Sequence, residues 1–248
     1  MQLHLSTWQE VEAYLANSKT IIVPVGSTEQ HGPNGLIGTD AICPEVIAKG
    51  VGDETGIMVG PTLNVGIAQH HLGFAGSMAI RPSTMIQIVK DWTDSLRLHG
   101  FEKFYFLNGH GGNIATLMAC FAELHGERSF AGAAGSNRPG IQCKLRNWWQ
   151  GPKVNAISKK EYGAAEGSHA TPSEVSVTYA AYPEAVKDVP MEPELAPRGG
   201  FTDAEDYRRT FPDGRIGSNP ALASVEVGHQ LIKAAVADTI DDLNQFKG

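Results

Sequence analysis

The stretch FEKFYFLNGHGGNIATLMACFAEL, residues 101–124, decides the fold. Its aromatic run at residues 104–107 predicts a strand, and apolar residues recur at helical spacing from Ile114 to Leu124. A glycine-rich loop joins the two. Strand, glycine loop and helix form half of a βαβ crossover, which predicts a parallel sheet.

The same alternation of strand and helix continues on both sides of this stretch. Short apolar runs predict strands at residues 20–25 (TIIVPV), 56–63 (GIMVGPTL) and 77–80 (SMAI). Helical spacing of apolar residues predicts helices at 40–51, within 82–100 and from Pro220 onward. The second of these helices should begin at Ser83 or Thr84 as N-cap and stop at Gly100.

Two segments fit neither pattern. SNRPGIQCKLRNWWQGPK (136–153) reads as an excursion or lid, and the segment at 183–201, rich in proline and acid, reads as a surface wrap. The sequence contains no internal repeat and no linker. We therefore predict a single α/β domain over residues 1–248, with a mostly parallel sheet flanked by helices.

Composition narrows the class of protein. With 42% hydrophobic and 19% charged residues, the 248-residue chain is of the globular type. A formal charge of -7 argues against nucleic acid as a partner. No apolar stretch reaches the roughly 20 residues that span a bilayer, and the N-terminus does not resemble a signal peptide, so we expect a cytoplasmic protein without membrane contact. Three scattered cysteines favour neither disulfides nor a CxxC metal site.

The loop EQHGPNGLIGTD (29–40) combines two acids and an imidazole at the end of a predicted strand. Glu29 and His31 should point to the same side in extended backbone, and glycines at 32, 35 and 38 could turn the chain so that Asp40 joins them. These are ligand types for Zn²⁺ or Mn²⁺. The alternative is a solvated loop with Asp40 as a helix N-cap.

Two further stretches carry histidine. In NGHGGN, His110 has little bulk beside it and could reach a neighbouring strand end, although a glycine-rich loop before a helix can also bind an anion. In EGSHATPSEVS, Glu174 could face a cation from the first turn of a helix, or only complete a capping box with Thr171. His169 would border the same site as an acid or base.

Five motifs together resemble the creatininase family of metal-dependent amidohydrolases. They are GSTEQHGPNGLIGTDA (26–41), GIAQHHLGFAGS (66–77), LNGHGGN (107–113), SHATPSEVS (168–176) and DGRIGSNPALASVEVG (213–228). The resemblance runs in order from about Pro24 to about Gly228. One departure is Gly112, which stands where creatininase itself has a metal-binding glutamate, so creatinine is an uncertain substrate.

The resemblance implies a dinuclear site of Zn or Mn, with Fe possible, in which Asp40 bridges the ions. Glu29 and His110 would hold one ion, and His31 and Glu174 the other. Three carboxylates, two divalent cations and a bridging hydroxide would together be neutral. That hydroxide would attack the carbonyl of a cyclic amide or formamide, and His169 would protonate the leaving nitrogen.

The resemblance also implies a homo-oligomer, commonly a hexamer, and a small-molecule amide substrate. His71 and Phe74 could line the substrate pocket, with Trp148 or Trp149 as an aromatic lid, although tryptophan is as readily explained by core packing. The other histidines, including His70, are expected to be structural or on the surface. Alternatives are a metallopeptidase-like member of the family, a non-catalytic metal-stabilised protein and an anion-binding module.

Overall fold

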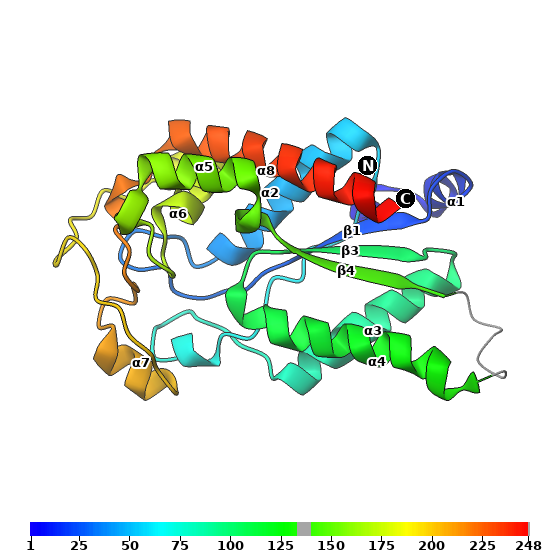
Figure 1. Ribbon diagram of the computed structural model, residues 1–248, viewed down its shortest axis with the longest axis horizontal. Coiled ribbons are helices and arrows are strands. Elements are labelled where there is room, and N and C mark those ends of the chain that lie inside the picture. Colours follow the sequence, from blue (N-terminus) through cyan, green and yellow to red (C-terminus); the bar gives the residue numbers. More distant parts are fainter. Residues whose placement is uncertain (133–139, 248) are drawn as a thin grey trace.

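Strand β1 (Thr20–Val25) lies in the middle of the molecule and is buried along its whole length. The computed structural model describes residues 1–132 and 140–247. In it, β1 pairs in parallel with β2 (Met58–Val59) on one side and β3 (Lys103–Asn108) on the other, and β3 pairs in parallel with β4 (Gln142–Asn147). The resulting strand order is β2-β1-β3-β4 (Figure 1), so the predicted parallel sheet is confirmed.

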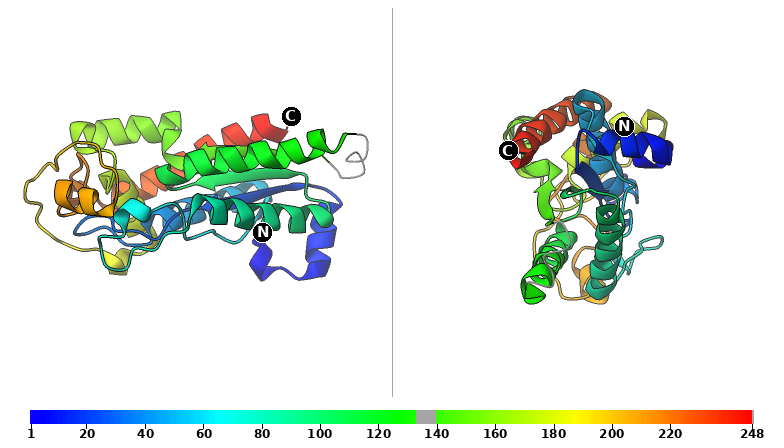
Figure 2. Two further views of the ribbon diagram at one scale, coloured as in Figure 1. Left: turned by 90° about the horizontal axis from the view of Figure 1, so that it is seen from below. Right: turned by 90° about the vertical axis from the view of Figure 1, so that its right-hand side faces the viewer.

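Helices cover both faces of this sheet, as Figures 1 and 2 show. Side chains alternate along each strand, so Ile22 and Tyr105 pack into one core and Ile21 and Phe104 into the other. The first core lies under α2 (Thr39–Thr55), α5 (Pro152–Glu161), α6 (Pro172–Ala181) and α8 (Val225–Lys247). The second lies under α3 (Pro82–Leu98) and α4 (Ile114–Phe130), with α1 (Trp8–Leu15) at its edge.

Several predicted boundaries were wrong, for local physical reasons. Of the predicted 56–63 strand, residues 58–59 form β2, and after the break at Gly60 and Pro61 Leu63 pairs once more, in an isolated bridge to Val25. The 77–80 segment forms one isolated bridge, between Thr28 and Met78. Helix α3 has Arg81 as N-cap and Pro82 at its first position, in place of the predicted N-cap at Ser83 or Thr84. The helix ends before Gly100, as predicted, and Gly100 adopts a φ of 109°. Helix α8 begins at Val225, after a short 3-10 turn at Pro220–Leu222.

The segment predicted as an excursion or lid contains strand β4. Residues 136–139 of that segment lie outside the described residues. From Gln142 the chain pairs residue by residue with β3, placing Cys143 beside Phe104 and Leu145 beside Phe106. The segment at 183–201 does run over the surface, with a single 3-10 turn at Pro183–Ala185. Helix α7 (Ala204–Thr210) follows it.

The three cysteines are free, as expected. Within the described part of the chain, none of the helices combines the length and apolar character needed to cross a membrane.

Candidate metal centre

The acids and imidazoles singled out in the sequence meet at the carboxyl edge of the sheet. The loop after β1 brings Glu29 and His31, the first turn of α2 brings Asp40, and the loop after β3 brings His110. Glu174 comes from the first turn of α6. A cavity of about 340 Å³ opens here, lined among others by Asp40, His110 and Glu174. Ligands collect at this edge of parallel α/β sheets.

The loop after β1 turns back through close backbone contacts. Gly32 has a φ of 68°, which glycine adopts without strain, whereas Gly38 has a φ of -86° and serves as the N-cap of α2. Asp40 therefore lies in the first turn of α2 and is not its cap. A Cβ at Gly109 would lie 1.9 Å from the Asp40 carbonyl oxygen, so only glycine lets the two loops approach.

Two asparagines hold the loop after β3. The Asn108 side chain accepts from the His110 backbone N–H at 3.2 Å and donates to the His110 carbonyl at 2.7 Å. Asn113 donates to the Gly26 carbonyl at 3.0 Å and accepts from the Ile67 N–H at 3.0 Å. The two asparagines of LNGHGGN thus bind this loop to the loop after β1 and aim the His110 ring.

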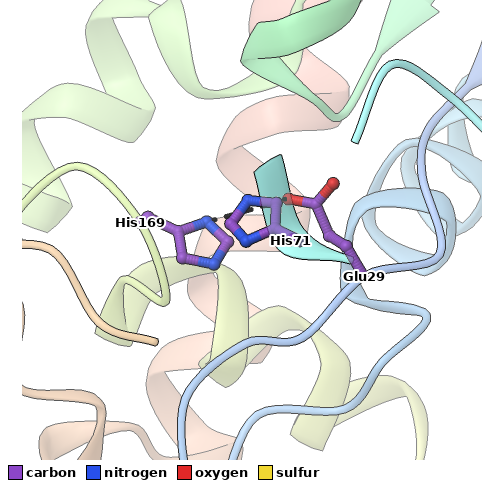
Figure 3. Close-up of side chains that lie close together, drawn as sticks. All are labelled: Glu29, His71 and His169. Carbon is purple, nitrogen blue, oxygen red and sulfur yellow. Dashed lines mark ion pairs between the residues drawn. The ribbon is translucent and has the colours of Figure 1, made fainter. Parts of the chain in front are cut away.

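The carboxylates and imidazoles lie within a few ångströms of one another. His110 Nδ1 is 2.9 Å from Asp40 Oδ2 and 3.3 Å from Glu29 Oε1. His31 Nε2 is 3.1 Å from Asp40 Oδ1 and 3.8 Å from Glu174 Oε1. Figure 3 shows Glu29 with two more imidazoles directed toward it, His71 at 3.1 Å and His169 at 3.8 Å.

Three of these imidazoles, those of His31, His110 and His169, hold their outer nitrogen on a backbone carbonyl. His110 Nε2 is 2.9 Å from the Ile67 carbonyl, His31 Nδ1 is 3.1 Å from the Glu29 carbonyl, and His169 Nε2 is 2.9 Å from the Gln30 carbonyl. A neutral ring that donates from its outer nitrogen turns a lone pair inward. In His31 and His110 that lone pair faces carboxylate oxygens. Such an arrangement is stable only with a proton or a metal cation between them.

The carboxylates also have unused bonding capacity. Both Glu29 oxygens and Asp40 Oδ2 are buried without a hydrogen-bond partner, although histidine nitrogens lie close. Among the residues that the structure describes, three sets of side chains could each hold a metal ion, with ligand atoms within 4.8 Å of one another. One of them is Glu29, His31 and Asp40, and another is His31, His169 and Glu174. Carboxylate and imidazole ligands of this kind suit zinc or manganese.

Without metal, protons must take the place of cations. Burial alone would lower the pKa of His31 and of His110, but Asp40 and its neighbouring carboxylates outweigh it and raise the two values to about 10 and about 9. Burial raises the pKa of Glu29 to about 8, with Asp40 adding to the effect and His110 opposing it. Despite its burial, Asp40 has a lowered pKa because His31 and His110 face it. The cluster therefore favours bound positive charge, whether as protons or as metal cations.

Gly112 has a structural reason to be glycine. A Cβ there would lie 2.4 Å from His110 Nε2 and 2.5 Å from the Ile67 carbonyl oxygen. These two atoms form the hydrogen bond that orients His110. A glutamate at this position is therefore incompatible with the observed loop, so any second metal must take its carboxylate from elsewhere.

Glu174 is a nearby carboxylate that completes a capping box and also lies close to His31. Thr171 and Glu174 form the complete capping box of α6. At the same time Glu174 Oε1 lies 3.8 Å from His31 Nε2, and burial raises the Glu174 pKa. Just before the cap, Ala170 has a φ of 52°, an unusual value for alanine that turns the chain between His169 and α6.

Of the four residues predicted to bind substrate, His71, Trp148 and Trp149 line the cavity. Trp148 is also part of the core under α8. Phe74 is not among the lining residues that the structure describes. Its ring packs edge-on to Tyr207, with the Arg208 guanidinium 4.2 Å from its centroid.

The lining residues that were not predicted from the sequence include Glu166, Phe201, Tyr207 and His70, the last of which had been expected to be structural or on the surface. The rings of His70 and Phe201 stack with centroids 4.8 Å apart, and Tyr207 packs edge-on to Phe201. Burial raises the pKa of Glu166 to about 7, and its Oε2 has no partner. In the sequence, the only sign that Glu166 could belong to the site was its position three residues before His169.

The fold and the cluster define an α/β protein with a candidate centre for divalent metals. A sequence model of the creatininase family, described as creatinine amidohydrolase, matches residues 4–243. The chain therefore belongs to the creatininase family of hydrolases.

Similar proteins agree with this membership. A 3-dehydro-scyllo-inosose hydrolase of Thermotoga maritima is 28% identical over 86% of this chain and 68% of its own. A creatinine amidohydrolase of Pseudomonas putida is 26% identical over 96% of this chain and 94% of its own. A solved structure named Creatininase Mn shares the fold, with a TM-score of 0.84 at 23% identity over 98% of this chain and 97% of the other.

Proposed function

We propose that the protein hydrolyses a carbon–nitrogen bond of a small cyclic amide or formamide, with two divalent ions, zinc or manganese, in the candidate metal centre. Asp40 would bridge the ions, with Glu29 and His110 on one side and His31 and Glu174 on the other. The observation that carries the proposal is the set of imidazole lone pairs facing buried carboxylates without hydrogen-bond partners. One of the solved neighbours is named as a manganese form.

When bound, such ions supply a water of lowered pKa and polarise the amide carbonyl. The chain supplies the rest. The carboxylates Asp40, Glu166 and Glu174 line the cavity and would repel an anionic substrate. The same three carboxylates argue against an anion site in the NGHGGN loop. His169, at the cavity wall, would deliver the proton that the leaving nitrogen needs.

The cavity also limits the substrate. About 340 Å³ is at the lower end of the range for small-molecule pockets. Stacked rings from His70 and Phe201 form one side, and a flat amide ring could lie against them. Glu166 Oε2, buried and without a partner, could accept a hydrogen bond from an N–H or O–H of the substrate.

Metal content and activity test the proposal together. Protein reconstituted with Zn²⁺ or Mn²⁺ is assayed for bound metal and against a panel of cyclic amides, formamides and short peptides. We expect two ions per chain and turnover of a non-peptide amide. One ion without turnover would support a structural metal site, none would support the anion-binding alternative, and turnover of peptides alone would support the metallopeptidase.

The variant His110→Ala tests whether the activity depends on the candidate metal centre. This variant should lose one ion and all amidase activity, because His110 Nδ1 faces both Glu29 and Asp40. His125→Ala is the matched control, since His125 is exposed on α4. Undiminished turnover in His110→Ala would rule out the dinuclear scheme.

A further inference from the structure

The side-chain amide of Gln30 is buried between two imidazoles of the site. Its Nε2 lies 3.0 Å from His71 Nδ1 and 2.9 Å from His169 Nε2. Gln30 is only 6% exposed, so water cannot substitute for these contacts. Which ring nitrogen carries the proton in each histidine follows from counting the hydrogens available here.

Backbone groups fix the orientation of the amide. The Gly32 N–H can only donate, and it lies 2.8 Å from Gln30 Oε1. The Gly214 carbonyl can only accept, and it lies 2.9 Å from Gln30 Nε2. A Cβ at Gly214 would lie 1.9 Å from Gln30 Oε1, so glycine permits this close approach. Of the two Nε2 hydrogens, one is used by Gly214 and one remains, and Tyr207 Oη, at 3.4 Å, lies farther away than either imidazole nitrogen.

The remaining hydrogen can satisfy only one of the two imidazoles. His169 Nε2 lies 2.9 Å from the Gln30 backbone carbonyl, which is an acceptor, so this nitrogen must carry a proton. A protonated nitrogen cannot accept from the amide. The second hydrogen therefore goes to His71 Nδ1, and the proton of a neutral His71 ring is on Nε2, 3.1 Å from Glu29 Oε1.

We infer that Gln30 is a positioning residue that fixes the tautomer of His71 through its side-chain amide and that of His169 through its backbone carbonyl, so that His169 turns an unprotonated Nδ1 toward the cavity and His71 is excluded as a metal ligand through Nε2. The catalytic consequence rests on the proposed function. His169 cannot begin as an acid. Its Nδ1 first takes a proton from the attacking water as the oxygen–carbon bond forms, and then returns that proton to the leaving nitrogen as the carbon–nitrogen bond breaks.

Neutron diffraction from deuterium-exchanged crystals of the zinc-loaded protein tests the tautomers directly and needs no substrate. The expected result is deuterium on Nε2 and none on Nδ1 in both His71 and His169, with two deuteriums on the Gln30 nitrogen. Deuterium on Nδ1 of either ring, or zinc on His71 Nε2, would overturn the inference.

Gln30→Glu tests the role of the side chain. A carboxylate of nearly the same shape cannot donate to His71 or to the Gly214 carbonyl, so His71 loses its fixed tautomer, whereas His169 keeps its bond to the backbone carbonyl of residue 30. Neutron diffraction from this variant should show the His71 deuterium moved to Nδ1 and the His169 deuterium still on Nε2. Gln69→Glu is the matched control, being exposed and two residues from His71.

Deuterium still on His71 Nε2 and absent from Nδ1 in Gln30→Glu would contradict the positioning role. If no amide is turned over even by the unaltered protein, the proposed function fails, while the neutron result still decides the tautomers.

Discussion

Asp40 is the residue on which the candidate centre depends most. Its two oxygens face different imidazoles, Oδ1 toward His31 and Oδ2 toward His110, which is the geometry that a bridging carboxylate needs. It holds this position because it is the second residue of α2 and because Gly109 lets the second loop pack against its backbone.

At the scale of single residues, the sequence was a good guide where chemistry is local. Glu29, His31 and Asp40 share one loop, and His110 lies between glycines, so their types and spacing already predicted a metal site. Tyr207 and Phe201 could not be found this way, because only tertiary folding brings α7 and the wrap before it to His70. No local sequence pattern predicts that these side chains come together.

His169→Ala should separate proton transfer from metal binding. The variant should retain both ions and lose about 10²-fold or more in kcat, because a proton-transfer group and not a ligand is removed. Metal analysis and steady-state kinetics on the same preparation provide the measurement. His169 also belongs to a set that could hold a metal with His31 and Glu174, so a parallel loss of metal would assign it as a ligand instead.

At the scale of elements, helix α5 depends on a carboxylate from another helix. Its N-cap is Gly151, which has no side chain, and Asp238 of α8 accepts the Lys153 and Val154 N–H groups at 2.9 and 3.1 Å. A Cβ at Gly151 would lie 2.0 Å from Asp238 Oδ2, so this arrangement requires glycine. The sequence offers no sign of this long-range cap.

Asp238→Ala should therefore lower the free energy of unfolding by about 2 kcal/mol, because it leaves two helix N–H groups without an acceptor. Urea unfolding at neutral pH measures the change. Asp241→Ala is the control: Asp241 is exposed and pairs with the Lys153 ammonium alone, so its loss should cost less than about 0.5 kcal/mol. Equal losses in the two variants would contradict the capping role.

The residue pattern of strand β4 explains why this strand was not predicted from the sequence. Its apolar residues Cys143 and Leu145 alternate with Lys144 and Arg146, a pattern that is typical of a half-buried edge strand. The tryptophans and prolines around it obscured that alternation. Strands β1 and β3, buried and continuously apolar, were easy to recognise.

The contact between β3, β4 and α8 should depend on pH. Asp242 accepts from Tyr105 Oη at 2.6 Å and from the Lys144 ammonium at 2.9 Å, and despite partial burial these bonds lower its pKa. A carboxyl with a lowered folded-state pKa stabilises the protein above its unfolded pKa of about 3.9, and the contribution disappears as pH falls through the folded value.

Asp242→Asn should accordingly be less stable than the unaltered protein at pH 7, by about 1 kcal/mol, and the difference should shrink below about pH 4. Chemical unfolding of both proteins at the two pH values gives the comparison. A difference that stays constant down to low pH would show that the charge of Asp242 contributes nothing.

At the scale of the whole molecule, the centre joins segments that the sheet alone does not hold together. The loops after β1 and β3 and the start of α6 come from three parts of the chain, and each brings a buried carboxylate or imidazole to the same place. Bound cations would cross-link these segments in the folded state only, since the unfolded chain has no such site.

Metal removal should therefore lower the melting temperature. A ligand present at about 100 times its Kd stabilises by about 2.7 kcal/mol, which for a chain of this size corresponds to about 5–11 °C. Thermal unfolding after chelation, and again after adding Zn²⁺ or Mn²⁺, measures the loss and its recovery. His125→Ala should recover fully and His110→Ala only in part. Recovery of equal size in both variants would place the stabilising metal outside the cluster of Glu29, Asp40 and His110, since only a ligand's loss can weaken the link between the two loops.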